Sequence, residues 1–177
     1  MIKVLNILLF VLCLVLGYFL IMGVVNPIKY KNQVTEREDA VHDKLLTIRD
    51  AQEMFRAKHD KFAPDFDTLK TVLKNDQLVS VNRVTLDTTR VAILDSLFKG
   101  DVSQVNELDK VPFSESTFTL DAGVLPSPSD STLFVPVFEA STNTSQFLDG
   151  VNPDYWERDK KVKVGSMTAP ITSGNWE

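Results

Sequence analysis

The chain has 177 residues, of which 44% are hydrophobic and 24% charged, and its formal net charge is −5 at pH 7. This length and composition are typical of a folded protein with about one domain, and they exclude a chain that is disordered throughout. No nucleic-acid partner is expected, because binding to phosphates requires clustered positive charge and the sequence has no long run of Lys or Arg.

The first predicted element is an apolar segment near the N-terminus. Residues Ile7 to Val25 carry no charge, and at about 1.5 Å per residue a helix of this length nearly spans a hydrocarbon core of about 30 Å. The segment is longer than the apolar region of a signal peptide, and Gly23 to Pro27 offers no small-x-small cleavage site. We therefore expect residues 1–26 to form a retained transmembrane anchor with a short cytoplasmic head, which makes the lipid bilayer one partner.

The charges that flank the segment are close to balanced. Lys3 precedes it, whereas Lys29, Lys31 and Arg37 follow it among acidic residues. A short head with a large trailing domain usually inserts with its head in the cytoplasm. We therefore expect a single-pass protein of the inner (cytoplasmic) membrane with its C-terminal domain, residues 27–177, in the periplasm; a domain outside the cell is the alternative.

A long helix is predicted to follow the anchor. No Gly or Pro occurs from Ile28 to Ala63, and apolar residues recur at spacings of mostly seven. Because Glu38, Gln52 and His59 occupy intermediate positions, the stripe is narrower than a coiled-coil seam. We expect residues 28–60 to form a helical spine that packs on the domain's own sheet, with a self-associating coil as the alternative. The packing stripe consists of Val34, Val41, Leu45, Ile48, Phe55 and Phe62.

Two prolines punctuate this region. Pro27 predicts a kink, because proline removes a backbone hydrogen bond and its ring clashes with the preceding turn. Pro64 prevents further helix after the spine. Asp65 or Asp67 is then expected to cap a short second helix that extends to about Leu73. Its predicted buried face consists of Phe66, Leu69, Val72 and Leu73.

The rest of the chain predicts strands. Asp87-Thr88-Thr89, Ala122-Gly123 and Pro126 to Asp130 are expected to be turns or breaks, and Asn152-Pro153-Asp154 to begin a short helical turn. Strands joined by short turns after an initial helix predict an α+β fold, with the long N-terminal helix packed on an antiparallel β-sheet. The predicted strands are Leu78 to Leu86, Arg90 to Phe98, Ser116 to Asp121, Thr132 to Ala140 and Lys161 to Gly165.

No constellation of residues predicts catalysis. His42 and His59 lie about 25 Å apart along the predicted helix, which is too far to share a metal. Cys13 is the single cysteine and lies in the apolar segment. Gly165-Ser166-Met167 is similar to the serine box of membrane-bound signal peptidases, but no Lys base follows Ser166. We expect no catalytic, cofactor-binding or metal-binding residues, and therefore a protein that is not an enzyme.

A resemblance to a known family is carried by Ile48, Ala51, Gln52, Phe55 and Phe62, followed by Phe66, Asp67 and Leu69. This pattern resembles that of type IV pilins and pseudopilins, whose membrane helix continues into a soluble domain and leads to an antiparallel sheet. The resemblance covers residues 1–75 and implies a pilin-like architecture. The chain lacks the Gly processing site and the nearby Glu that the family uses in assembly, so pilin assembly is not implied.

A second resemblance lies in the segments Val135 to Ala140 and Gly174 to Glu177, which are similar to segments of single-pass envelope proteins of Bacteroidota. It implies a location in the cell envelope and no particular activity. We expect a membrane-anchored structural or assembly component whose partners are other envelope proteins or itself. A tethered periplasmic module that binds a ligand or peptide is the alternative.

Overall fold

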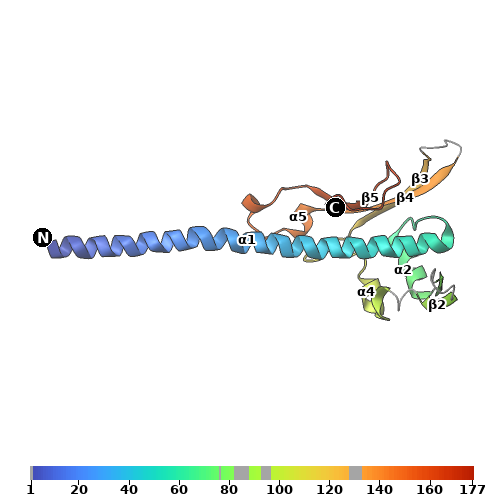
Figure 1. Ribbon diagram of the computed structural model, residues 1–177, viewed down its shortest axis with the longest axis horizontal. Helices are drawn as coiled ribbons and strands as arrows, with labels where there is room; N and C mark the ends of the chain where they lie inside the picture. Colours follow the sequence, from blue (N-terminus) through green and yellow to red (C-terminus); the bar gives the residue numbers. More distant parts are fainter. Residues whose placement is uncertain (1, 76, 82–87, 93–96, 128–132) are drawn as a thin grey trace.

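The computed structural model describes residues 2–75, 77–81, 88–92, 97–127 and 133–177. One long helix, α1 (Ile2–His59), runs the length of the molecule, and the other elements gather along its second half (Figure 1). The α+β class, with a long N-terminal helix packed on an antiparallel sheet, is confirmed. The other elements are α2 (Phe66–Asn75), β1 (Gln77–Val81), β2 (Thr88–Ala92), α4 (Val102–Asn106), β3 (Thr119–Pro126), β4 (Phe134–Asn143), α5 (Thr144–Phe147), η1 (Pro153–Tyr155) and β5 (Lys161–Gly165).

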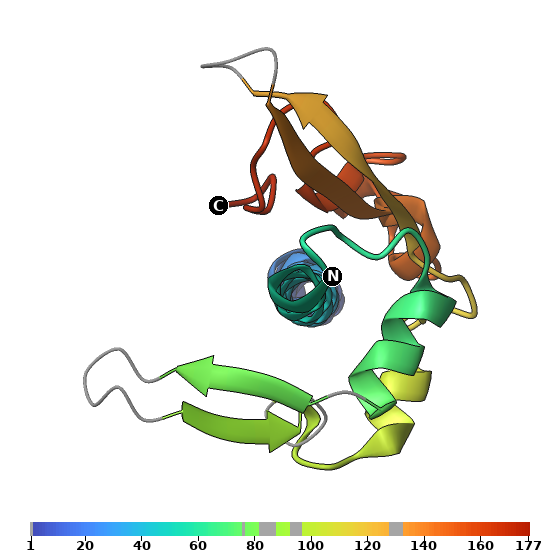
Figure 2. The same ribbon diagram turned by 90° about the vertical axis from the view of Figure 1, so that its right-hand side faces the viewer.

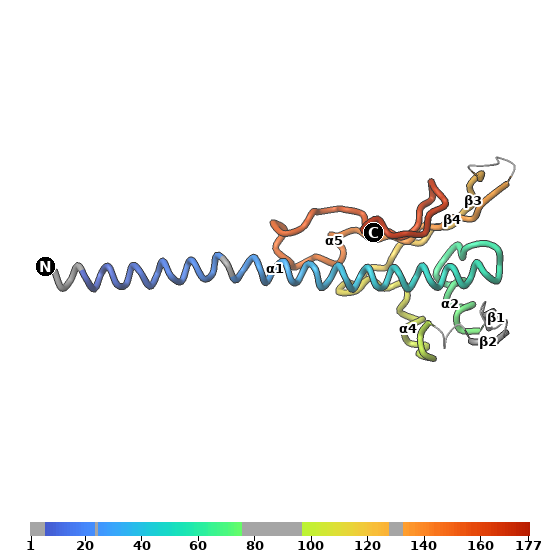
Figure 3. The backbone as a smooth tube through the Cα atoms, in the orientation of Figure 1, coloured from blue at the N-terminus to red at the C-terminus, as the bar shows by residue number. Residues whose placement is uncertain are grey.

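Helix α1 contains 58 residues, which corresponds to about 87 Å at 1.5 Å per residue. It continues through Pro27 without a break, and the tube in Figure 3 shows no sharp bend at that point. The kink expected at Pro27 is therefore not seen as a sharp bend of the helix axis. The physical reason is that proline removes only one hydrogen bond of the ladder, and the turns on both sides remain helical.

The end of α1 is fixed by a buried amide. Asp60 adopts a left-handed conformation (φ 56°), which ends the helix, and the chain then doubles back. The side chain of Gln52 is fully buried, where its Nε2 donates to the carbonyl oxygen of Ala63 (3.0 Å) and its Oε1 accepts from the Ala63 N–H (2.8 Å). Gln52 thus belongs to the buried face of α1, which is wider than the apolar residues alone predict.

Helix α2 begins as expected after Pro64. The carboxylate of Asp65 accepts a hydrogen bond from the backbone N–H of Thr68 (2.7 Å), so Asp65 and not Asp67 is the capping residue. Leu69 and Leu73 are buried against the core, whereas Phe66 and Val72 are half-buried at its edge.

Two antiparallel sheets flank α1. Figure 2 looks along α1 and shows the three-stranded sheet, in the order β3-β4-β5, on one side and the two-stranded sheet β1-β2 on the other. Phe138 and Ala140 on the central strand β4 are fully buried, and the ring of Phe138 lies 4.6 Å from that of Phe62. At the end of β5, Gly165 has φ +76°, and a Cβ there would lie 2.3 Å from the Phe138 carbonyl oxygen, so only glycine fits.

Several boundaries differ from the sequence predictions. Ala122 and Gly123, expected to form a break, lie inside β3 and pair with β4, because the ladder overrides the weak strand preference of Gly. A Cβ at Gly123 would lie 3.2 Å from the end of the Met167 side chain, so a larger residue there would require Met167 to shift slightly. Thr88 and Thr89, expected in a turn, are strand residues of β2. Asp87 and residues 128–130 of the expected turns lie outside the described residues.

Other predicted elements match more closely. The strand Lys161–Gly165 and the short helical turn at Pro153 have the expected positions. Strand β3 begins at Thr119, later than the expected Ser116, and β4 extends past Ala140 to Asn143. The short helices α4 and α5 were not expected, since each has five residues or fewer and too little periodicity to be recognised.

We predict that Gln52→Leu lowers the free energy of unfolding by roughly 2 kcal/mol or more. The substitution leaves the buried N–H and C=O of Ala63 without partners, and each unsatisfied group costs about 1–3 kcal/mol. Urea unfolding of the detergent-solubilised chain, followed by tryptophan fluorescence, measures the effect. Glu53→Leu, at the exposed neighbouring position, is the matched control and should change stability little. Equal stability of the two variants would contradict the role of Gln52.

Candidate membrane span and membrane-proximal cleft

The N-terminal half of α1 has an apolar surface on all sides. Every large apolar side chain that the structure describes between Ile7 and Ile28 is exposed, with accessible fractions from 39% at Met22 to 73% at Leu20. Folded proteins in water rarely expose a contiguous apolar surface of this size. Helix α1 is long and apolar enough to cross a membrane.

The second half of α1 has its apolar residues on one buried face. All six residues of the packing stripe belong to the core, from Val34 with 8% of its surface accessible to Val41, Leu45 and Ile48 with none. Phe55 belongs to the same face of α1, and Phe62 joins the core from the segment just beyond the end of the helix. Strands β4 and β5 and helix α2 contact α1 in this half, so the stripe packs within the chain's own domain and not in a self-associating coil.

The domain first meets α1 at a ring stack. Tyr30, two residues beyond Ile28, stacks on Tyr155 of η1 with ring centroids 5.4 Å apart. Two turns further along α1, the Arg37 guanidinium donates to the backbone carbonyls of Phe147 (2.8 Å) and Asp149 (2.9 Å). These contacts fasten the segment between α5 and β5 to α1.

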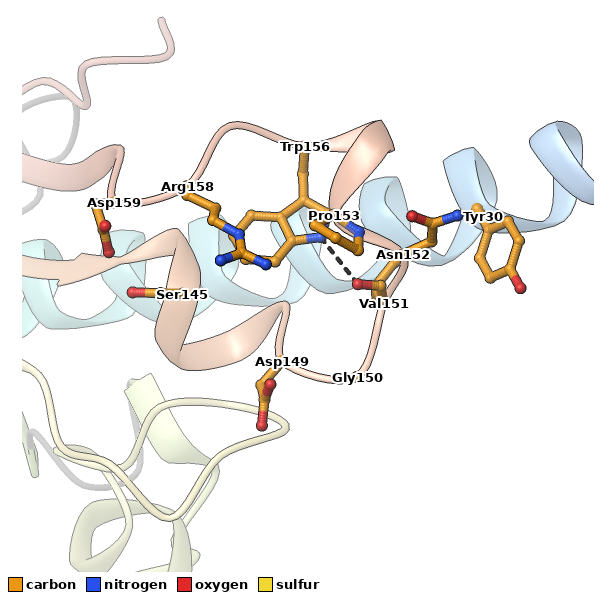
Figure 4. A pocket seen from close by; sticks show the side chains of 10 residues that line it. All are labelled: Tyr30, Ser145, Asp149, Gly150, Val151, Asn152, Pro153, Trp156, Arg158 and Asp159. Atoms are coloured by element: carbon orange, nitrogen blue, oxygen red, sulfur yellow. Dashed lines mark hydrogen bonds between the residues drawn. The ribbon is translucent and has the colours of Figure 1, made fainter.

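A cleft of about 680 Å³ opens between this segment and α1, and we call it the membrane-proximal cleft. In Figure 4, Tyr30 lies at one end of it and Asp159 at the other, with Trp156 and Arg158 between them. The indole N–H of Trp156 donates to the carbonyl of Val151 (3.2 Å), which holds the loop closed on itself. The lining residues are Tyr30, Ser145, Asp149, Gly150, Val151, Asn152, Pro153, Trp156, Arg158 and Asp159.

The loop that forms the cleft is built locally. The side chain of Asn152 accepts a hydrogen bond from the Asp154 N–H (3.1 Å) and so begins η1, where Pro153 supplies a helical φ. At the base of the loop, the buried Thr144 hydroxyl donates to the Glu157 carbonyl (2.6 Å) and accepts from the Lys160 N–H (3.1 Å). The cleft is therefore preformed.

The last residues form a second attachment of the sheet to α1, which we call the C-terminal strap (Ser173 to Glu177). Its Trp176 stacks on His42 with centroids 4.1 Å apart and planes inclined by 11°. Asn175 accepts from the Lys163 N–H (3.0 Å) and donates to the Lys161 carbonyl (2.8 Å), so the strap lies along the outer edge of β5. Partial burial of the imidazole lowers the pKa of His42. This effect outweighs the attraction of Glu38 and the nearby aspartates, which would raise the pKa.

A cross-strand ion cluster lies on the opposite face of the sheet from α1. The largely buried carboxylate of Glu139 on β4 binds the ammonium groups of both Lys161 and Lys163 on β5, the latter at 2.7 Å. Burial opposes ionisation of Glu139, but the hydrogen bonds and charges of the two lysines prevail and lower its pKa. The alternation of β5 indicates that both lysines share a face, whereas their partner depends on strand register and could not be read from the sequence.

The remaining chemistry-bearing residues have structural partners. His59 packs on Phe55, with centroids 4.4 Å apart, and does not approach His42. Ser166 is buried and bonds the hydroxyl and N–H of Thr168 in a turn. Among the described residues, no group of three or more His, Cys, Asp or Glu side chains could hold a metal ion. The membrane-proximal cleft is thus the strongest candidate site on the folded domain.

Comparison with known proteins gives no relative: no family model matches the chain, and neither the curated proteins nor the solved structures contain a significant match.

We predict that the domain loses stability as the pH falls from 7.5 to 5.5. The folded chain binds a proton at His42 more weakly than the unfolded chain, whose His titrates near pH 6.5, so protonation favours unfolding below about that pH. Urea midpoints at the two pH values measure the effect. His42→Phe retains a ring to stack on Trp176 but has no proton to bind, and should show a smaller difference. An unchanged pH difference in this variant would rule out His42 as the cause.

Proposed function

We propose that this protein is a non-enzymatic structural or assembly component of the cell envelope, with a pilin-like architecture. One observation carries the proposal: a single unbroken helix bears both the exposed apolar surface up to Ile28 and the buried stripe from Val34 to Phe55. An enzyme or a simple tether needs no rigid connection between its anchor and its core. A component that must hold its domain at a set height and angle does.

The proposed location is the inner membrane, with α1 crossing once and the domain in the periplasm. The support is the exposed apolar surface of α1 together with the short head before it, because a short head usually remains in the cytoplasm. Other envelope proteins, or further copies of the chain, are the proposed partners.

A tethered ligand- or peptide-binding module is the second candidate. Two observations favour it. The membrane-proximal cleft is large enough for a small ligand. In addition, β3 pairs only with β4 among the described strands, which leaves an edge that an extended peptide could join, while the strap covers the edge of β5.

A flexible insertion separates the two candidates. We predict that a short Gly-Ser linker inserted between Asn26 and Pro27 abolishes most in-cell cross-links to partners or to other copies, because the domain is no longer rigidly coupled to its anchor. Quantitative mass spectrometry of the affinity-purified chain measures the cross-links. The same linker placed after Glu177 is the control and should leave them unchanged. If both variants keep their cross-links, the structural role is wrong and a tethered module is favoured.

We also predict that alkaline phosphatase fused after Glu177 is active. Green fluorescent protein fused at the same point should be dark, because it does not become fluorescent when the general secretory route exports it. Both results follow from a periplasmic domain, since the phosphatase needs an oxidising compartment to form its disulfides. Activity and fluorescence of the two fusions in cells are the measurements. If the green fluorescent protein fusion is fluorescent and the phosphatase fusion is inactive, the domain lies in the cytoplasm.

A further inference from the structure

Strand β3 has an edge along which its backbone groups point away from the sheet. In an antiparallel ladder, alternate residues direct their N–H and C=O groups toward the partner strand. The N–H of Ser127 donates to the carbonyl of Leu133 (2.7 Å) in register with the β3–β4 ladder, so the odd-numbered residues of β3 bond to β4. The backbone groups of Leu120, Ala122 and Val124 therefore face outward. Within the described part of the chain, no backbone group outside the ladder bonds to them.

The opposite edge of the same sheet is already covered by an extended segment. The C-terminal strap lies along β5, where the N–H of Gly165 donates to the carbonyl of Ser173 (3.0 Å) and the N–H of Asn175 to the carbonyl of Lys163 (3.0 Å). An uncovered sheet edge is a template for an added strand, because its backbone donors and acceptors are already aligned. The edge of β3 is thus the position at which a further strand can join this sheet.

The apolar face of the β3–β4 hairpin extends beyond the core of the domain. Leu120 and Ala122 pack against the core on the face that carries the buried Phe138. Strand alternation places Val124 and Phe134 on this face too, yet 60% and 66% of their surfaces are accessible. Figure 1 shows the hairpin at the end of the domain far from the N-terminus. An added strand with apolar residues at alternate positions would extend the covered part of this face.

On the other face of the sheet, a negative charge of β3 lacks a described cation. Asp121 lies directly opposite Glu139 in the ladder, and like charges in this position are destabilising. Glu139 is neutralised by Lys161 and Lys163 of β5. Asp121 is exposed, and none of the described ion pairs includes it. A cation on a strand added to β3 would lie beside Asp121 and complete the alternation of charge across the sheet.

We infer that the open edge of β3 binds an extended segment of a partner protein, which adds as an antiparallel strand with Lys or Arg opposite Asp121 and apolar residues opposite Ala122 and Val124. In chain order the segment reads apolar, any residue, apolar, cation. Strand β3 itself has no Lys or Arg, so the same strand of a second copy does not supply this pattern. The inference rests on the proposed binding of other envelope proteins or peptides, and it names the surface and the chemistry of the bound segment.

Two labelled peptides test the charge preference. The Lys peptide is Ser-Thr-Val-Thr-Val-Lys-Val-Thr-Ser with an N-terminal fluorescein, and the Glu peptide has Glu in place of Lys. Fluorescence anisotropy measures their Kd for the full-length chain in lipid nanodiscs, and empty nanodiscs control for binding to lipid. We expect the Lys peptide to bind roughly fivefold more tightly than the Glu peptide, because only Lys pairs with Asp121. In Asp121→Lys the preference should reverse.

A proline at the edge tests strand addition itself. Val124→Pro removes an outward N–H while the bonds between β3 and β4 remain, because proline is tolerated where the N–H faces away from the sheet. We expect the Lys peptide to bind about tenfold more weakly or worse. Val124→Ala retains the N–H and should weaken binding by less than about threefold. Circular dichroism and urea midpoints verify that both variants are folded, and equal effects of the two substitutions would overturn strand addition.

The remaining outcomes are distinct. If neither peptide binds the wild-type chain, the inference is wrong, whereas the cross-links that test the proposed function are unaffected. If Asp121→Lys still prefers the Lys peptide, the assignment of the cation is wrong. Analytical ultracentrifugation of the detergent-solubilised chain identifies the third case. A dimer that Val124→Pro converts to a monomer would show that a second copy, and not a partner protein, occupies the edge.

Discussion

Burial of one face of α1 between Val34 and Phe55 is the interaction on which the folded domain depends. This face contacts β4, β5 and α2, and its residues belong to the same core cluster as the buried residues of those elements. N-terminal to this face the same helix has no buried side, because every large apolar side chain that the structure describes from Ile7 to Ile28 is exposed. The transition takes place within a few residues, at Tyr30 and Val34. One helix therefore combines a half that is long and apolar enough to cross a membrane with a half that is buried in the protein interior.

Three fastenings hold the smaller elements to this helix at different heights. Tyr30 and Arg37 hold the loop of the cleft nearest the apolar end, and His42 holds Trp176 of the C-terminal strap further along. Gln52 holds the turn that leads into α2. Each uses a polar or aromatic group instead of an aliphatic one. Such contacts have preferred directions, so they define the angular position of each element on the helix as well as its attachment.

Much of the helical part of the fold could be predicted because its signals are local. The spacing of apolar residues identified the stripe, and a short sequence pattern predicted a cap at Asp65 or Asp67, of which the structure shows Asp65. The sequence pattern placed Gln52 among the polar positions of the helix. Its partner, Ala63, comes close to it only because the chain turns back after α1, which the pattern does not show. The clusters around Glu139 and Trp176 were missed for the same reason. Their partners lie on distant elements, so the contacts depend on strand register and on how the sheet meets α1.

The unbroken passage of α1 through Pro27 has a consequence for how the chain can vary in length. Each residue of an α-helix turns the chain by about 100° and advances it by 1.5 Å. Insertion of a single residue between Ile28 and Val34 would thus swing the entire domain about a quarter of a turn around its axis while hardly changing its height. The number of residues in this short junction therefore sets the direction in which each surface of the domain faces around the axis of α1.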